Sequence, residues 1–187
     1  MLMRVITGFC KGKRLITPDG KDVRPTSDKV KEAVFSALQF DIEGRRVLDL
    51  FAGSGQLGIE ALSRGAESAT FVDSAISSVK IIKKNIELCG LQDKTKVFNL
   101  DYASFCAMSR DTFDIAFLDP PYSEGILPLA LKAVLPLMSS FGIIVCEHPS
   151  EVELPESIGG FSILKAYSYG KIKVTVYNNG NRKGTIS

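Results

Sequence analysis

The chain has 187 residues, of which 45% are hydrophobic and 24% charged, with a formal net charge of +2 and four cysteines. This composition suits one soluble domain with a buried core, and it excludes a disordered tail, a collagen-like rod and a disulfide-scaffolded mini-protein. No apolar run reaches the roughly 18 to 20 residues of a membrane span, and the start of the chain lacks a signal sequence. We therefore expect a cytoplasmic monomer without a metal site or membrane contact.

Positive charge is concentrated at the start of the chain. Residues 1–31 carry eight Lys and Arg against three Asp, a net charge of +5, so the other 156 residues carry −3. Two β-prone segments, 4–7 and 13–17, predict a hairpin that presents these charges, with residues 1–25 forming a basic extension before a main domain over 26–178. Such clustering is typical of polyanion binding, because each neutralised phosphate releases counterions. The alternative is a solvated basic surface.

Beyond the hairpin, hydrophobic periodicity predicts helices that alternate with strands, which indicates a parallel, doubly wound α/β sheet. The last two strands are separated by three residues, too few for a parallel crossover, so we expect an antiparallel hairpin there. Residues 179–187 are expected to form a flexible tail. The predicted helices are 25–40, 56–64, 75–89, 103–108 and one that Pro128 opens and Pro136 bends or ends, and the predicted strands are 46–51, 69–73, 96–100, 113–119, 143–147, 161–167 and 171–177.

Four of the predicted strands close on an aspartate, namely Asp49, Asp73, Asp101 and Asp119. In a doubly wound sheet, ligands bind outside the carboxyl ends of the strands, so these carboxylates should gather along one edge. An Asp in this position also commonly caps the following helix, which is the alternative for Asp73 or Asp101 taken singly. Four clustered anions are costly to desolvate unless a ligand supplies donors or positive charge.

A glycine-rich turn follows the first predicted strand. Gly53, Gly55 and Gly58 form a G-x-G-x-x-G pattern, and Asp73 lies 20 residues beyond Gly53, where a ribose-binding acid is expected. This pattern suits NAD as well as other nucleosides. Asp49, immediately before the turn, would repel a pyrophosphate and attract a ligand that carries an ammonium and a sulfonium group. S-adenosylmethionine has both cations, so we predict it as the cofactor.

The segment Asp119-Pro120-Pro121-Tyr122 is stiff and rich in acceptors, because the prolines have no N–H and hold the preceding residue extended. The Asp119 carboxylate and the Pro120 carbonyl can accept the two hydrogens of an exocyclic aryl amine, while Tyr122 stacks on the base. These two hydrogen bonds favour tetrahedral geometry at the amine nitrogen, which makes its lone pair available for nucleophilic attack. We predict Asp119, Pro120 and Tyr122 as the catalytic set; the alternative is a rigid Pro-Pro turn.

The segments 49–55 and 119–122 resemble the S-adenosylmethionine-dependent amino-methyltransferases. One group of these enzymes matches more of the sequence. Over residues 4–177 the chain resembles the bacterial 16S rRNA guanine-N2 methyltransferases, and the most specific matches are the segments 4–8, 11–15 and 24–32. The resemblance implies a Rossmann-like methyltransferase sheet and transfer of a methyl group to N2 of guanine 966 of 16S rRNA in the small ribosomal subunit. Two departures are Phe9-Cys10 in place of an aromatic-basic pair, and Asp73 where Glu is common.

The resemblance also implies roles for individual residues. By this resemblance, the region 24–32 should close over the methionine end of the cofactor. The position of Asp73 and Asp101 after their strands separately predicts that Asp73 binds the ribose and Asp101 the adenine. The target guanine leaves its stack and lies against Tyr122. The implied cofactor-binding residues are Asp49, Phe51, Gly53, Gly55, Asp73, Asp101, Asp119 and Thr26, and the implied RNA-binding residues are Arg4, Lys11, Lys13, Arg14 and Arg24.

Four other functions remain as alternatives. A DNA adenine-N6 methyltransferase should bring a separate target-recognition domain, and a protein glutamine methyltransferase would fit Asn better than Asp119. A non-catalytic nucleotide-binding assembly factor needs no methyl transfer, and an NAD oxidoreductase is disfavoured by Asp49.

Two single residues have structural interpretations: we expect His148 to be a solvated loop residue and Cys10 to pack inside the hairpin.

Overall fold

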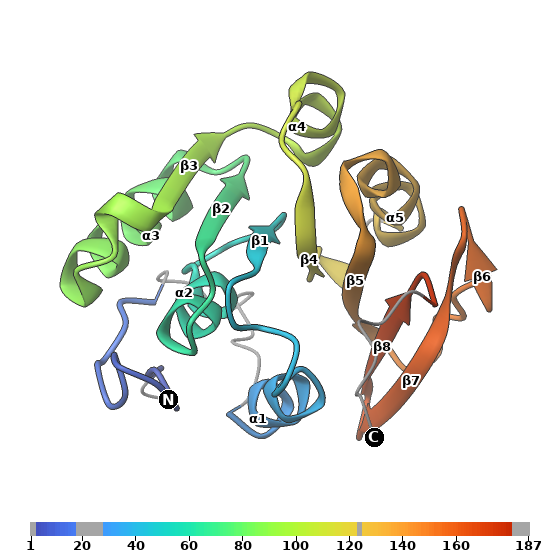
Figure 1. The fold of residues 1–187 in the computed structure, drawn as a ribbon, viewed down its shortest axis with the longest axis horizontal. Helices are drawn as coiled ribbons and strands as arrows, with labels where there is room; N and C mark the ends of the chain where they lie inside the picture. The colour runs from blue at the N-terminus through green and yellow to red at the C-terminus, as the bar shows by residue number, and fades with distance from the viewer. Residues whose placement is uncertain (1–2, 18–27, 123–124, 181–187) are drawn as a thin grey trace.

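The fold, seen in a computed structural model, is one mixed sheet with helices on both faces (Figure 1). The structure describes residues 3–17, 28–122 and 125–180. The strands are β1 (Arg46–Asp49), β2 (Ser68–Asp73), β3 (Thr95–Asn99), β4 (Phe113–Leu118), β5 (Met138–Pro149), β6 (Ser157–Ile158), β7 (Phe161–Tyr169) and β8 (Ile172–Asn178). The helices are α1 (Asp28–Ala37), α2 (Gln56–Ser63), α3 (Ile76–Cys89), α4 (Tyr102–Met108) and α5 (Leu127–Val134), with 3₁₀ turns at Gln92–Lys94 and Leu135–Leu137.

The eight strands lie in the order β3-β2-β1-β4-β5-β8-β7-β6. The strands from β3 to β5 are parallel, and β8, β7 and β6 are added antiparallel. The chain moves outward from β1 to β3, then returns to place β4 on the other side of β1. Ligands of doubly wound sheets bind at such a switch point, outside the carboxyl ends of the strands. The predicted α/β sheet with its antiparallel C-terminal hairpin is confirmed.

Two hydrophobic cores hold the helices to the sheet. Helices α1, α2 and α3 cover one face, and α4 and α5 cover the other (Figure 1). On the first face Phe35 of α1 packs on Phe117 of β4, with their ring centroids 5.7 Å apart. On the second face Leu131 of α5 is buried in the same cluster as Tyr177 of β8. Burial of both faces explains why the central strand β4 is almost continuously apolar.

The helix ends follow the glycine and proline signals in the sequence. Gly90 adopts a left-handed conformation (φ 70°) and caps α3 at its C-terminus. Pro128 lies in the first turn of α5, where a missing N–H costs nothing. Pro136 cannot continue the α-helix, so α5 ends at Val134 and only a 3₁₀ turn follows.

The N-terminal segment, residues 3–17, forms the expected small hairpin, in which the N–H groups of Val5 and Leu15 donate to the carbonyl oxygens of Lys13 and Met3. It contains a single antiparallel bridge, between Arg4 and Arg14, and lies against the domain. The backbone N–H groups of Ile6 and Thr7 donate to the two carboxylate oxygens of Glu60 in α2 (2.7 and 3.0 Å). Four side chains of the segment are buried in the core that α1, α2 and α3 share, namely Met3, Val5, Cys10 and Leu15. The segment is therefore anchored by its apolar side chains, while its charges face outward.

Strand β5 is longer than predicted, because its first residue pairs with Phe113 of β4 and its last pairs with Ile172 of β8. The two-residue strand β6 was not predicted. Asn179, which we expected in the flexible tail, donates to the carbonyl oxygens of Ser139 and Ser140. The rest of that tail, residues 181–187, lies outside the described residues. Within the described ranges, no helix is both long and apolar enough to cross a bilayer.

Candidate active site

The carboxyl ends of β1 to β5, here called the carboxyl edge, bring the predicted acids together. Asp49 is the last residue of β1 and pairs in register with Phe71, two residues before Asp73. Asp73 in turn pairs with Asn99, two residues before Asp101. The negative charge of Asp73 is the smallest of the causes that shift the pKa of Asp49, and it raises this pKa because the two carboxylates lie near one another. Parallel register alone therefore gathers acids that are far apart in the sequence.

Asp49 is the most deeply buried of these acids, with only 2% of its surface exposed. Its Oδ2 accepts a hydrogen bond from the backbone N–H of Gly58, in the first turn of α2 (3.0 Å). Burial raises the pKa of Asp49 to about 7, the hydrogen bond from Gly58 opposes this shift, and Asp73 adds to it. A carboxylate in this state is poised to bind a cation, because a positive ligand would offset the cost of its desolvation.

The glycine-rich turn follows Asp49 and opens α2. Gly53 has a φ of 55°, and its N–H donates to Oδ2 of Asp73 (2.8 Å). A Cβ at Gly53 would have no heavy atom within 4 Å, so the backbone is open to a ligand at this point. At Gly58, by contrast, there is no room for a side chain, because a Cβ there would lie 2.4 Å from the ring of Phe71. The turn thus combines an exposed backbone with close helix–strand packing, as nucleoside-binding turns require.

Asp73 and Asp101 both act as acceptors for nearby backbone N–H groups. Asp73 Oδ1 accepts from the N–H of Ala75, at the start of α3 (2.8 Å). Asp101 is the N-cap of α4 and accepts from the N–H and the hydroxyl of Ser104, which lower its pKa, the hydroxyl bond most strongly. The helix-cap interpretation of Asp101 is therefore observed. A carboxylate has about four acceptor positions, so these bonds leave capacity for ligand hydroxyls.

Phe51 follows β1 at the carboxyl edge, two residues after Asp49. It is half-buried, and its ring packs on Tyr102 of α4 with 5.6 Å between the centroids.

The D-P-P-Y segment follows β4 at the same edge. Asp119 is half-buried, Pro120 is buried and Tyr122 is 37% exposed. The hydroxyl of Tyr122 donates to Oε1 of Glu147, at the end of β5 (2.9 Å). The sequence analysis did not consider Glu147 as a site residue. The signal was nevertheless present, because a fifth predicted strand ends on an acid just as the first four do.

The expectation for His148 was wrong. This residue belongs to β5 and is 1% exposed. Its Nε2 lies 2.9 Å from Oγ1 of Thr175 on β8, and its Nδ1 lies 2.9 Å from the carbonyl oxygen of Pro149. The strand continues beyond the predicted end because β8 pairs with it as far as Pro149, which turns an apparent loop into a buried ladder.

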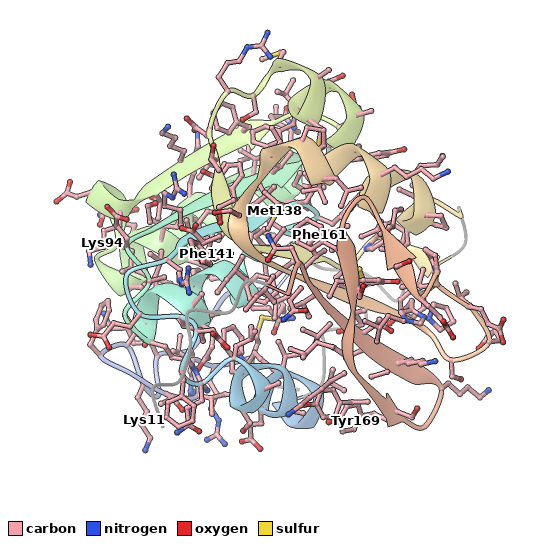
Figure 2. All side chains as sticks on the ribbon, turned by 45° about the vertical axis from the view of Figure 1, so that its right-hand side comes forward. Lys11, Lys94, Met138, Phe141, Phe161 and Tyr169 are labelled. Carbon is pink, nitrogen blue, oxygen red and sulfur yellow. The ribbon has the colours of Figure 1, made fainter. Side chains whose placement is uncertain are left out.

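The basic residues of the N-terminal segment are exposed, and Figure 2 shows Lys11 at the margin of the molecule. The Nζ of Lys13 donates to the carbonyl oxygen of Leu88 near the end of α3 (2.7 Å), so this charge is partly used within the protein. The predicted residues Arg24 and Thr26 lie outside the described residues.

Among the residues that are described, no group of three or more His, Cys, Asp or Glu side chains is arranged to hold a metal ion.

The sheet order and the glycine turn, with the buried acid before it, place the protein among the Rossmann-like, S-adenosylmethionine-dependent methyltransferases. Residues 3–178 match the model of the family described as conserved hypothetical protein 95, and the chain belongs to this family.

Curated relatives and a solved structure agree with this assignment. The chain is 43% identical to the "Putative rRNA methyltransferase YlbH" of Bacillus subtilis, over 94% of this chain and 98% of the relative. It is 33% identical to the "Ribosomal RNA small subunit methyltransferase D" of Escherichia coli, over 94% and 89% of the two chains. The solved "Putative methyltransferase yhhF from Escherichia coli" superposes with a TM-score of 0.84 at 29% identity, covering 95% and 98%. The predicted family, enzyme class and cofactor are confirmed, while the roles of single residues stay predictions.

Proposed function

We propose that this protein transfers a methyl group from S-adenosylmethionine to N2 of guanine 966 of 16S rRNA in the small ribosomal subunit. Support at the level of the family comes from relatives named as rRNA methyltransferases at 33 and 43% identity. The structural observation that carries the proposal is the D-P-P-Y segment at the end of β4, next to the strand that ends in Asp49 and the glycine turn. The residues proposed to bind the methyl donor and those proposed to bind the guanine thus share one edge.

The residues of the glycine turn fit the cofactor. S-adenosylmethionine supplies an electrophilic methyl group on a sulfonium. Asp49 offers a buried carboxylate whose raised pKa shows that the protein leaves its charge insufficiently compensated. The open backbone at Gly53 would contact the methionyl part, together with Phe51, Gly55 and the unplaced Thr26.

The nucleoside part of the cofactor would lie further along the carboxyl edge. Asp73 would accept from the ribose hydroxyls, and Asp101 from the adenine amino group. Both carboxylates are held by backbone N–H groups, which fixes their orientation before any ligand arrives.

The substrate residues lie at the ends of β4 and β5. Asp119 and the carbonyl oxygen of Pro120 would accept the two hydrogens of the guanine N2 amino group, which orients the nitrogen lone pair for attack. Tyr122 would stack on the base, and the anchoring of its hydroxyl by Glu147 holds the ring in place. The exocyclic nitrogen needs little general-base help, because a methylated aryl-ammonium loses its proton readily.

The N-terminal segment would bind the flanking rRNA. Arg4, Lys11, Lys13 and Arg14 are exposed on a segment that four buried side chains anchor to the core, so the backbone that carries these charges is held in place. Together with Arg24, these residues would contact phosphates, which gives affinity without reading bases.

Transfer of a labelled methyl group tests the proposal. Purified protein is incubated with labelled S-adenosylmethionine and with small subunits, naked 16S rRNA or DNA, and the product is digested to nucleosides. We expect label in N2-methylguanosine at one position of 16S rRNA and none in DNA. Label in N6-methyladenine of DNA would support the rival enzyme, and cofactor binding without transfer to any substrate would support the assembly factor.

A further inference from the structure

Two acids stand side by side on neighbouring strands at the carboxyl edge. Strands β4 and β5 are parallel, and their register pairs Leu118 with Cys146. The next residue on each strand is therefore an acid, Asp119 on one and Glu147 on the other. Adjacent parallel strands lie about 4.8 Å apart, so the two side chains start from neighbouring positions.

Glu147 is unusual among the acids of this edge because it is bound to the D-P-P-Y segment itself. Only 7% of its surface is exposed, and its Oε1 accepts the hydroxyl proton of Tyr122 (2.9 Å). A carboxylate has about four acceptor positions, so an oxygen that accepts from Tyr122 can accept a second donor. The bond therefore places an acceptor beside the ring on which the target base would stack.

The Watson–Crick edge of guanine presents the N1–H group next to the N2 amino group, so its two neighbouring donors match two neighbouring carboxylates. Adenine presents an unprotonated N1 at the same place, which a carboxylate would repel. We propose that Glu147 is a specificity-determining residue that accepts the N1–H of the target guanine while Asp119 accepts from N2. This inference rests on the proposed function and adds to it the means by which guanine is chosen.

The burial of Glu147 makes such a contact discriminating. An analogue with an unprotonated N1 sets a nitrogen lone pair against the carboxylate of Glu147, and in a buried site neither group can turn to water instead. An exposed carboxylate would lose little, since water would replace the missing donor. The alternative role for Glu147 is purely to hold Tyr122, and this role would affect every stacked base alike.

A substrate pair separates these roles. Small-subunit rRNA is prepared with either guanine or 2-aminopurine at the target position; 2-aminopurine keeps the amino group at C2 but has an unprotonated N1. We expect the wild-type enzyme to prefer guanine in kcat/KM by on the order of tenfold to a hundredfold. In Glu147→Gln the amide can donate to the unprotonated N1, so the preference should fall towards the intrinsic reactivity ratio of the two amines. Because this intrinsic ratio is the same for both enzymes, it cancels in the comparison.

Two variants serve as controls. Tyr122→Phe removes the hydroxyl that Glu147 holds, and it should lower kcat/KM for both bases by the same factor. Glu151→Gln neutralises an exposed acid nearby and should leave the preference unchanged. Unfolding temperature and cofactor binding, measured by calorimetry, establish that Glu147→Gln is folded.

The outcomes are distinct. Equal losses on guanine and 2-aminopurine in Glu147→Gln would reduce Glu147 to a support for Tyr122 and overturn the inference. If that variant does not fold, the wild-type preference is divided by the intrinsic reactivity ratio of the two amines, measured without enzyme, and no remaining preference for guanine would also overturn the inference. Failure of the wild-type enzyme to methylate any guanine would instead refute the proposed function.

Discussion

The carboxyl edge has two regions that are built differently. The cofactor half, at the ends of β1 to β3, holds Asp49 and Asp73 with backbone N–H groups of the segments that follow β1 and β2. The substrate half, at the ends of β4 and β5, joins Tyr122 to Glu147 by a bond between side chains 25 residues apart in the sequence. The acids of the first half are held by backbone N–H groups, and the residues of the second half are held by a bond between two side chains.

This difference matches what each half would bind. A small cofactor with constant chemistry suits acceptors that rigid backbone groups orient, since little needs to move. A base that leaves an RNA stack must be received by a ring that is accessible, and the partial exposure of Tyr122 is compatible with the stacking role proposed for it. Changes in the cofactor half should therefore alter cofactor affinity or folding, and changes in the substrate half should alter turnover.

The largest expected effect is on turnover in the substrate half. Asp119→Ala removes one of the two acceptors for the N2 amino group, so kcat should fall by on the order of a hundredfold or more. Calorimetry should show S-adenosylmethionine binding that is close to the wild-type level. Asp111→Ala, which breaks an exposed ion pair with Lys96, is the matched control and should keep full turnover. Unchanged turnover in Asp119→Ala would remove this residue from the mechanism and erase the distinction between the halves.

In the cofactor half, Gly58→Ala should destabilise the fold. The new Cβ would lie 2.4 Å from the ring of Phe71, so helix α2 and strand β2 must separate. We expect a loss of about 1–3 kcal/mol in the free energy of unfolding, measured by denaturant titration. In a double-mutant cycle Phe71→Leu should recover part of this loss. Purely additive effects would show that the helix contacts Phe71 less closely than described.

The affinity for the cofactor should depend on pH through Asp49. Burial raises the pKa of this acid to about 7, so its carboxylate is ionised mainly above that pH. A cationic ligand binds the ionised form, and the dissociation constant should therefore rise about tenfold for each pH unit below 7 and level off above it. The same shift makes the free energy of unfolding depend on pH. The neutral, buried carboxyl of Asp49 stabilises the fold below about pH 4, and this stabilisation is lost as the pH rises from 4 through 7. Titration calorimetry from pH 5.5 to 8.5 gives the profile.

Asp49→Asn is the matched variant for the pH profile, because it keeps the shape of the side chain and cannot ionise. Its affinity should be low and independent of pH in this range. A wild-type profile without a slope near pH 7 would contradict a direct interaction between Asp49 and the cationic end of the cofactor.

The smallest expected effect is on rRNA binding by the N-terminal segment, which lies outside both halves of the carboxyl edge. Arg14→Glu reverses an exposed charge, so it should weaken rRNA binding and lower the slope of log K against log salt by about 1–2. Lys165→Glu, on exposed β7, makes the same change in net charge and serves as the control. Arg14 is the better test than Lys13, because Lys13 also holds the carbonyl of Leu88. Equal slopes in both variants would mean that the N-terminal segment does not anchor RNA.

The local parts of the site could be predicted from the sequence. The glycine pattern, the acid before it and the acid 20 residues later specify one turn and one ligand class, because they lie within one strand–helix–strand unit, from β1 through α2 to β2. The stiffness of the D-P-P-Y segment follows from proline chemistry alone. Gly90 and Pro136 likewise marked the ends of their helices.

What the sequence missed depended on strand pairing. His148 looked like a loop residue because its burial comes from β8, which lies more than twenty residues further along the chain. Glu147 showed no sign of contact with Tyr122, since only the register of β4 with β5 brings them together. The same holds for the N-terminal segment, whose alternating apolar residues did not reveal that they insert beside α2 and α3.

The amino-acid sequence by itself determined the order of elements, the glycine turn and the acids that end the strands, because backbone sterics and side-chain charge act over a few residues. The tertiary structure decided which of these acids are buried, which are neighbours and which residue supports the aromatic ring. Burial and register arise from contacts between distant segments, and no local pattern of residues encodes the partner that each strand will find.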